Sequence, residues 1–207
     1  MAENKVRFGL SNVAVAFINH DGEGEVDYET PIMVPGAVTL TRDAEGDQST
    51  FYADNSAYYT INSNAGYTGE LTMALVPDEI KARMLGWKID ANGALVEIAD
   101  SVPEQFALLY RLEGDQKRRF NVLYNVTVNR PSAENNTTED SAEPETEAMP
   151  FTAGPIVYQG EKITQASIEP NEKNTESISS FYQKVYLPNL STSYKVGTPV
   201  ATVSKKN

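Results

Sequence analysis

The chain has 207 residues and a formal net charge of −12, from 17 basic and 29 acidic side chains, with no cysteine and one histidine, His20. These counts exclude disulfides, thiol nucleophiles and cysteine-based metal sites, and a single histidine cannot supply the imidazoles of a common zinc site. The negative charge argues against wrapping nucleic acid, because affinity for phosphate comes from clustered Lys and Arg.

Alternation of apolar and polar residues is the dominant pattern along the chain and predicts a mainly β protein. The most regular alternation covers 106–112 and 120–128, and the polar loop between these segments has the length and chemistry of a hairpin connection. Polar stretches at 20–25 and 43–48 are expected to be turns. The other strands are expected near residues 6–10, 13–17, 26–28, 38–41 and 67–75.

Two segments depart from the alternation and predict short α-helices that flank the β body. Pro77 and Asp78 begin the first, because proline and an acid both suit a helix start, and Gly86 can end it. The second covers about 174–186 and ends before Pro188. We expect this second helix to pack on an outer face of the β body through one apolar stripe, formed by Ile178, Phe181, Tyr182 and Val185.

The domain organisation follows from where these patterns weaken. Residues 1–188 are predicted to form a single β domain, and 189–207 an extension that becomes ordered only against a partner. Within the domain, 132–147 carries six acids and no base, which predicts a solvated loop. The first ten residues lack the features of a signal peptide, and no apolar run approaches the roughly 18 residues that span a bilayer.

No motif singles out a catalytic, cofactor or metal site. The acidic turn that begins at His20 lacks the glycine and the final glutamate of a calcium-binding loop, since Val26 and Ile32 occupy those positions. A glycosidase needs two carboxylates held across a groove, and no pair among the 29 acids lies in an aromatic, strand-borne context. We therefore expect that the protein is not an enzyme and that it binds neither a cofactor nor a metal ion.

The most informative segment is an aromatic and polar run at 49–69, which has high β propensity and a single charge, Asp54. It contains two aromatic pairs, Phe51–Tyr52 and Tyr58–Tyr59. An ordinary buried hairpin and a strand that pairs with another subunit explain this run equally well. In the second case the run is an exposed edge that requires a neighbouring chain.

Several groups of residues, spread over most of the chain, form a series that is found in one protein family. They are Val6-Arg7-Phe8-Gly9-Leu10-Ser11-Asn12-Val13, Pro35-Gly36-Ala37-Val38, Leu40, Glu45-Gly46-Asp47, Ser49, Phe51-Tyr52-Ala53-Asp54-Asn55, Ala57-Tyr58-Tyr59, Asn64, Gly66-Tyr67, Gly69, Leu71, Ala74-Leu75-Val76-Pro77, Gly114-Asp115-Gln116-Lys117, Tyr124-Asn125, Arg130-Pro131, Glu139-Asp140-Ser141 and Glu145-Thr146-Glu147. This series resembles the major tail protein family of long, non-contractile-tailed phages of Gram-positive bacteria. The resemblance covers about residues 4–160, and 175–188 is similar to an aromatic helix that some members carry near their end.

The resemblance implies a tail-tube-type β-sandwich or barrel with one or two short flanking α-helices. It also implies homo-hexameric rings that stack into a tube, with the tape measure, tail terminator and distal tail proteins as partners, in a virion assembled in the bacterial cytoplasm. Phage DNA would pass through the lumen without specific binding. The expected subunit and ring interface residues are Phe51, Tyr52, Asp54, Asn55, Tyr58, Tyr59, Glu139, Asp140 and Glu143.

Two other function classes remain open from the sequence. One is a β-sandwich binding module of a virion that recognises a carbohydrate or a receptor. The other is the tube protein of a contractile injection system, whose fold is similar.

If part of the charge of −12 per copy lines a lumen, DNA phosphates would meet like charge and slide rather than bind.

Overall fold

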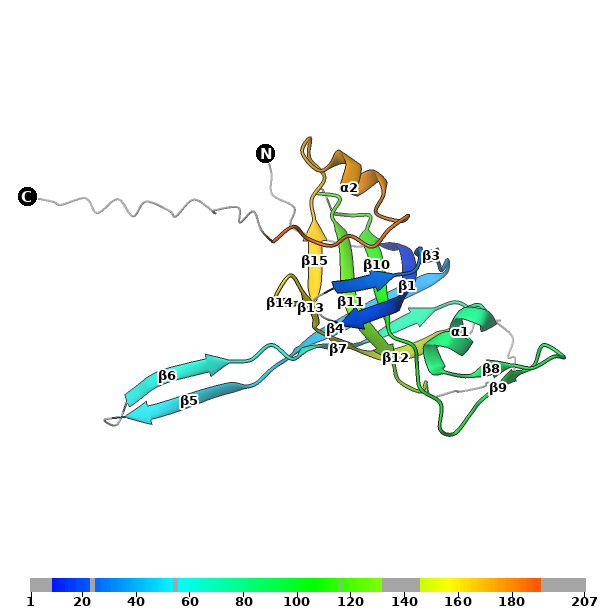
Figure 1. Ribbon diagram of the computed structural model, residues 1–207, viewed down its shortest axis with the longest axis horizontal. Helices are drawn as coiled ribbons and strands as arrows, with labels where there is room; N and C mark the ends of the chain where they lie inside the picture. The colour runs from blue at the N-terminus through cyan, green and yellow to red at the C-terminus, as the bar shows by residue number, and fades with distance from the viewer. Residues whose placement is uncertain (1–8, 23–24, 54–55, 116, 132–145, 191–207) are drawn as a thin grey trace, which may run out of the picture.

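The computed structural model describes residues 9–22, 25–53, 56–115, 117–131 and 146–190. It is mainly antiparallel β with two short helices, as the sequence predicts (Figure 1). None of the described helices is long and apolar enough to cross a membrane. The helices are α1 (Asp78–Leu85) and α2 (Thr175–Ser179), and the strands are β1 (Leu10–Gly22), β2 (Glu25–Tyr28), β3 (Ile32–Met33), β4 (Ala37–Glu45), β5 (Gln48–Ala53), β6 (Ser56–Asn62), β7 (Gly66–Met73), β8 (Lys88–Ile89), β9 (Leu95–Val96), β10 (Phe106–Leu112), β11 (Phe120–Val128), β12 (Glu147–Gly154), β13 (Ile156–Tyr158), β14 (Glu161–Ile163) and β15 (Gln165–Ile168).

One large antiparallel sheet organises the body, with its strands in the order β2-β1-β10-β11-β12-β7-β4. The short strands β3 and β15 add to β1 and β11, respectively. The sheet curls so that β4, at one end of this order, also lies against β1 near the other end. This curling gives the sheet an inner and an outer face, in the manner of a partly closed barrel.

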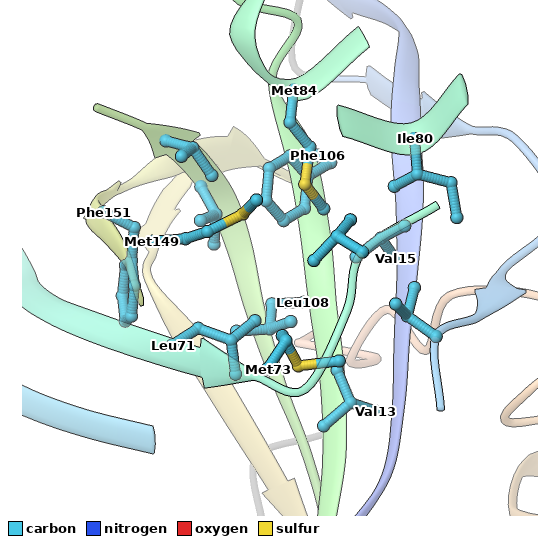
Figure 2. Packing of buried hydrophobic residues seen from close by; sticks show 14 of the residues in the cluster. Val13, Val15, Leu71, Met73, Ile80, Met84, Phe106, Leu108, Met149 and Phe151 are labelled. Atoms are coloured by element: carbon cyan, nitrogen blue, oxygen red, sulfur yellow. The ribbon is translucent and has the colours of Figure 1, made fainter. Parts of the chain in front are cut away.

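The inner face holds the main hydrophobic core. Alternate residues of β1, β7, β10, β11 and β12 point into it, and Phe17 meets Phe106 edge to face at 5.8 Å between ring centroids. Helix α1 covers one end of this core with Ile80 and Met84 (Figure 2). Trp87 packs half-buried against the same cluster.

Helix α1 begins and ends where the sequence predicts. Pro77 precedes it, and Gly86 ends it with a left-handed φ of 70°. Arg83 fastens the helix to the sheet, because its guanidinium contacts Glu29 and Glu104 and lies 3.7 Å from the centroid of the Phe17 ring. The hydrogen bonds from Arg83 hold the pKa of Glu29 below its ordinary value.

The C-terminal apolar stripe packs on the outer face, as predicted. Phe181 and Val185 are buried there, and the Phe181 ring lies 5.0 Å from that of Phe120. The regular helix is shorter than the expected 174–186, since α2 covers only Thr175–Ser179 and turns follow it. The backbone tightens there, because the Phe181 N–H donates to the Ile178 carbonyl, three residues back, at 3.3 Å.

Two segments that the sequence predicts as turns are more extended in the structure. Strand β1 continues to Gly22, so the turn expected at 20–25 is reduced. The turn expected at 43–48 is wrong, because β4 runs to Glu45 and β5 resumes at Gln48. The polar composition of this segment reflects exposure of an extended ribbon, and not a reversal of the chain.

The outer face of the sheet divides into two halves. Over β1, β10 and the first half of β11 it is apolar and covered by a second core that includes Phe120, Tyr124, Ile156 and Phe181. Over β4, β7 and β12 the outward residues are polar or small, and most are exposed. The uncovered half requires an explanation other than core packing.

Candidate functional site

The aromatic run identified in the sequence forms a hairpin that leaves the body of the molecule. Strands β5 and β6 pair only with each other, as a separate two-stranded sheet. They continue β4 and β7, so that the four strands form one long ribbon with its far end away from the core (Figure 1). At about 3.3 Å per residue, the six residues of β5 extend about 20 Å. Among the residues that the structure describes, no other strand pairs with this hairpin.

Close backbone contacts at the root hold the two arms of the hairpin together. The Asp47 N–H donates to the Ser63 hydroxyl at 2.9 Å, and the Ser63 N–H donates to the Asp47 carbonyl at 2.9 Å. Gly46 is required here, since a Cβ at this position would collide with the Ser63 carbonyl oxygen. Pairing also slips by one residue between Glu45–Gly66 and Gln48–Asn62, which marks a bulge at the root.

The structure brings four of the nine expected interface residues together on this hairpin. Phe51 and Tyr52 lie in β5, Tyr58 and Tyr59 lie in β6, and Phe51 pairs with Tyr59 across the ladder. The Tyr59 side chain is 62% exposed. The remaining five, Asp54, Asn55, Glu139, Asp140 and Glu143, lie outside the described residues.

A second surface is the uncovered outer half of the sheet. It is formed by alternate residues of β4, β7 and β12, because Leu40, Leu71 and Met149 on the same strands point into the inner core. We call this surface the acidic threonine face, and its members are Thr39, Thr41, Asp43 and Glu45 on β4, Thr68, Glu70 and Thr72 on β7, and Ala148, Pro150 and Thr152 on β12.

Cross-strand hydrogen bonds join the side chains of this face. Thr39 donates to the Thr72 hydroxyl at 2.9 Å, and Thr68 donates to a Glu45 carboxylate oxygen at 3.0 Å. Its three acids, Asp43, Glu45 and Glu70, are all exposed. The face is therefore hydrophilic and negatively charged.

The one basic residue of these three strands is turned away from the acidic threonine face. Arg42 lies over the Tyr67 ring at 5.5 Å on the opposite side of the sheet, and its guanidinium donates to Gln165 at 2.6 Å. The Gln165 amide in turn donates to the Tyr67 hydroxyl at 2.8 Å. This network ties β4 and β7 to β15 and keeps positive charge off the acidic threonine face.

The described residues contain a hollow but no cluster of metal-binding side chains. A shallow hollow of about 440 Å³ lies near the root of the hairpin, lined by backbone and by Glu45, Tyr67, Asn125 and Thr152, with Glu45 its single acid. No group of three or more His, Cys, Asp or Glu side chains in the described chain could hold a metal ion. The hairpin and the acidic threonine face can contact another molecule and act on it through their charge.

Sequence reasoning found the hairpin but missed the acidic threonine face. The signal was present in the alternation of Thr39, Thr41, Asp43 and Glu45 with apolar or inward residues, and in the similar pattern at 68–72. Such alternation indicates an exposed strand face. It does not reveal that three polar faces lie side by side, because that depends on the order of strands in the sheet.

Comparisons with known proteins place the chain among phage structural proteins. The sequence model of a family described as phage tail tube protein matches residues 2–189. No curated protein sequence matches. Among solved structures, the chain is similar to one from the cryo-EM structure of the anti-feeding prophage baseplate, with 9% identity, a TM-score of 0.43, and coverage of 82% of this chain and 98% of that one. It is also similar to a type six secretion system protein, with 11% identity, a TM-score of 0.34, and coverage of 76% and 94%.

Proposed function

The chain belongs to the phage tail tube protein family, and from this membership we propose that its copies form hexameric rings that stack into the tail tube. The tube is the conduit through which the genome leaves the virion. In this role the protein acts as a structural subunit and not as an enzyme. Its partners are further copies of itself and the tape measure, terminator and distal tail proteins, and DNA passes without specific binding.

The hairpin β5–β6 is the observation that carries the proposal. A two-stranded ribbon alone in water is marginally stable, and one rich in aromatic residues exposes apolar surface and unpaired backbone groups. A neighbouring copy that covers the ribbon would bury the apolar surface and pair the backbone groups. A contact between one end of a copy and a different surface of the next is heterologous, and repetition of such contacts builds rings or filaments.

The acidic threonine face supports the second half of the proposal, transit of DNA. If this face lines the lumen, the duplex meets threonine hydroxyls and the carboxylates of Asp43, Glu45 and Glu70. Phosphates are attracted by clustered Lys and Arg and repelled by carboxylates, so the surface offers no binding site along the path. The uncovered half of the sheet would then be polar because it faces water and DNA in the assembled tube.

The proposal is tested by electron microscopy of the purified protein at high concentration. We expect rings or hollow tubes from the wild-type chain. A variant in which Thr50–Thr60 is replaced by Asn-Gly removes most of the hairpin, since Ser49 and Ile61 are paired and a two-residue turn can join them. We expect this variant to fold with an unchanged body and to form no tubes. Normal tubes from the variant would refute the role of the hairpin.

A further inference from the structure

The hollow near the root of the hairpin has a floor that contains two glycines. Glu45 on β4 pairs with Gly66 on β7, and Gly154 on β12 pairs with Asn125 on β11. Gly66 and Gly154 are themselves neighbours, because a Cβ built on Gly66 would lie 3.3 Å from the Gly154 Cα. With no side chain on the two middle strands, the surface of the sheet is open between Glu45 and Asn125. We call this opening the glycine trough.

The glycine trough crosses the strands and has the size of a ligand site. At about 4.8 Å between neighbouring strands, the backbones at its two ends are about 14 Å apart. Its volume of about 440 Å³ lies in the range of small-molecule sites. In the next row along the strands, Thr68 pairs with Thr152 and Thr152 with Thr127, so that three hydroxyl-bearing residues border the trough. Glycine inside a strand often marks a place where another molecule approaches the backbone closely.

The lining of the trough offers hydrogen-bond acceptors and one negative charge. Glu45 is exposed, and the lining includes no Lys, Arg or His. At the other end, Asn125 Oδ1 is shielded from solvent and has no hydrogen-bond partner among the described residues. A buried acceptor without a partner requires an explanation. The Asn125 Nδ2 faces Gly154, at 3.8 Å from a Cβ built there, so a half-turn of the amide would bring the oxygen to the trough instead.

We propose that the glycine trough binds the arginine side chain of a protein partner that lies against the acidic threonine face. A guanidinium is planar and carries five N–H donors and no acceptor, which suits a floor of exposed backbone and a lining of acceptors. One edge of it pairs with the Glu45 carboxylate, and the remaining donors are left for the threonine hydroxyls and the turned Asn125 amide. The carboxylates of Asp43 and Glu70 on the same face also favour a cationic partner.

Other ligands match the trough less well. A divalent cation prefers several carboxylate oxygens, and the lining holds a single acid, Glu45. A phosphate would be repelled by the same carboxylate. A lysine ammonium is a compact, strongly hydrated point charge, so it gains little from a floor of backbone. Arginine binding needs only one folded subunit, so it can be measured whether or not the subunits assemble.

An NMR titration of the isotope-labelled protein tests the choice of ligand. The probe is an arginine flanked by two glycines in a peptide blocked at both ends, compared with the same peptide carrying lysine or citrulline, the uncharged analogue of arginine. We expect saturable shifts of the Gly66 and Gly154 amide signals with the arginine peptide. The lysine and citrulline peptides should bind at least about tenfold more weakly. Unshifted glycine signals, or equal affinity for arginine and either analogue, would overturn the proposal.

Single variants locate the site with the same arginine peptide. Glu45→Gln removes the charge but keeps an acceptor for the Thr68 hydroxyl, and should weaken binding at least about tenfold. Gly154→Leu should abolish binding by filling the trough, since a Cβ there meets only the Asn125 amide and the backbone is not left-handed.

The matched control is Glu70→Gln, which removes the same charge from the same face outside the trough and should change the affinity less than about twofold. The spectrum of each variant shows whether it is folded, and Glu45→Gln decides the outcome if Gly154→Leu is not. Equal losses in Glu45→Gln and Glu70→Gln would indicate attraction to the whole face and overturn the assignment of the trough.

Discussion

Asp115 shows how one carboxylate organises a loop. Its side chain is 3% exposed and lies in the connection between β10 and β11. It accepts a hydrogen bond from Arg119 Nε at 2.8 Å and another from the Lys117 N–H at 3.2 Å. The hydrogen bond from Arg119 is the largest cause that lowers the pKa of Asp115, to about 2. The loop that joins the two central strands is therefore held by an ionised acid.

Replacement of this residue should change how stability depends on pH. The pKa of Asp115 is about 2 in the folded protein and about 3.9 when unfolded, so ionisation favours folding above pH 4 and this contribution is lost as pH falls toward 2. We expect Asp115→Asn to lower the free energy of unfolding by about 2 kcal/mol at pH 7. Urea unfolding of both proteins between pH 7 and pH 3 measures the difference. A difference that stays constant down to pH 3 would contradict this explanation.

At the scale of elements, Gly46 lies where β4 passes into the β5–β6 hairpin, and we call this position the joint of the ribbon. The backbone of the two arms is too close there for a side chain, because a Cβ would collide with the Ser63 carbonyl. The hairpin has its own two-stranded ladder beyond this joint, whereas the main hydrophobic core lies in the body. A change at the joint should therefore alter the direction of the hairpin more than the stability of the body.

The variant Gly46→Ala tests this separation. We expect the thermal midpoint of the body to stay within a few degrees of wild type, while tube formation falls sharply because the hairpin is displaced from its partner. Gly154→Ala is the matched control, since a Cβ there meets only the Asn125 amide at 3.8 Å. Tube yield is measured by sedimentation and microscopy. Unimpaired tubes from Gly46→Ala would show that the joint tolerates a methyl group.

The elements that could be predicted from sequence were those whose pattern is local. Period-2 alternation located the strands at 106–112 and 120–128, and Pro77 with Gly86 bounded α1. The continuity of β4 into β5 was missed because Asp43–Gln48 has the composition of a turn while its backbone stays extended. The aromatic run at 49–69 was equally compatible with a buried hairpin and with a strand that pairs with another subunit, and the structure shows that β5 and β6 leave the body of the molecule (Figure 1). The acidic threonine face depends on the order of strands in the sheet, which local patterns do not encode.

At the scale of the whole molecule, the charge of the proposed lumen should control the rate of DNA exit. We expect phages carrying Asp43→Lys and Glu70→Lys to assemble normal tails and to eject DNA at least about tenfold more slowly, because each ring would offer repeated cationic contacts to the phosphates. Fluorescence of released DNA from purified particles measures the rate. The control pair, Glu161→Lys and Glu172→Lys, makes the same change of charge at exposed positions outside the acidic threonine face. Equal ejection rates from the two double variants would show that the acidic threonine face does not line the lumen.

The ribbon also has a mechanical consequence. If neighbouring copies are joined through its far end, the link between them consists of two strands about 20 Å long rather than two rigid bodies in contact. A two-stranded ribbon twists and bends more easily than a packed sheet, because no second layer resists the motion. A tube built this way can curve by small deformations shared among many ribbons, while the bodies of the subunits keep their shape. We expect long, gently bent tubes to retain an unbroken wall.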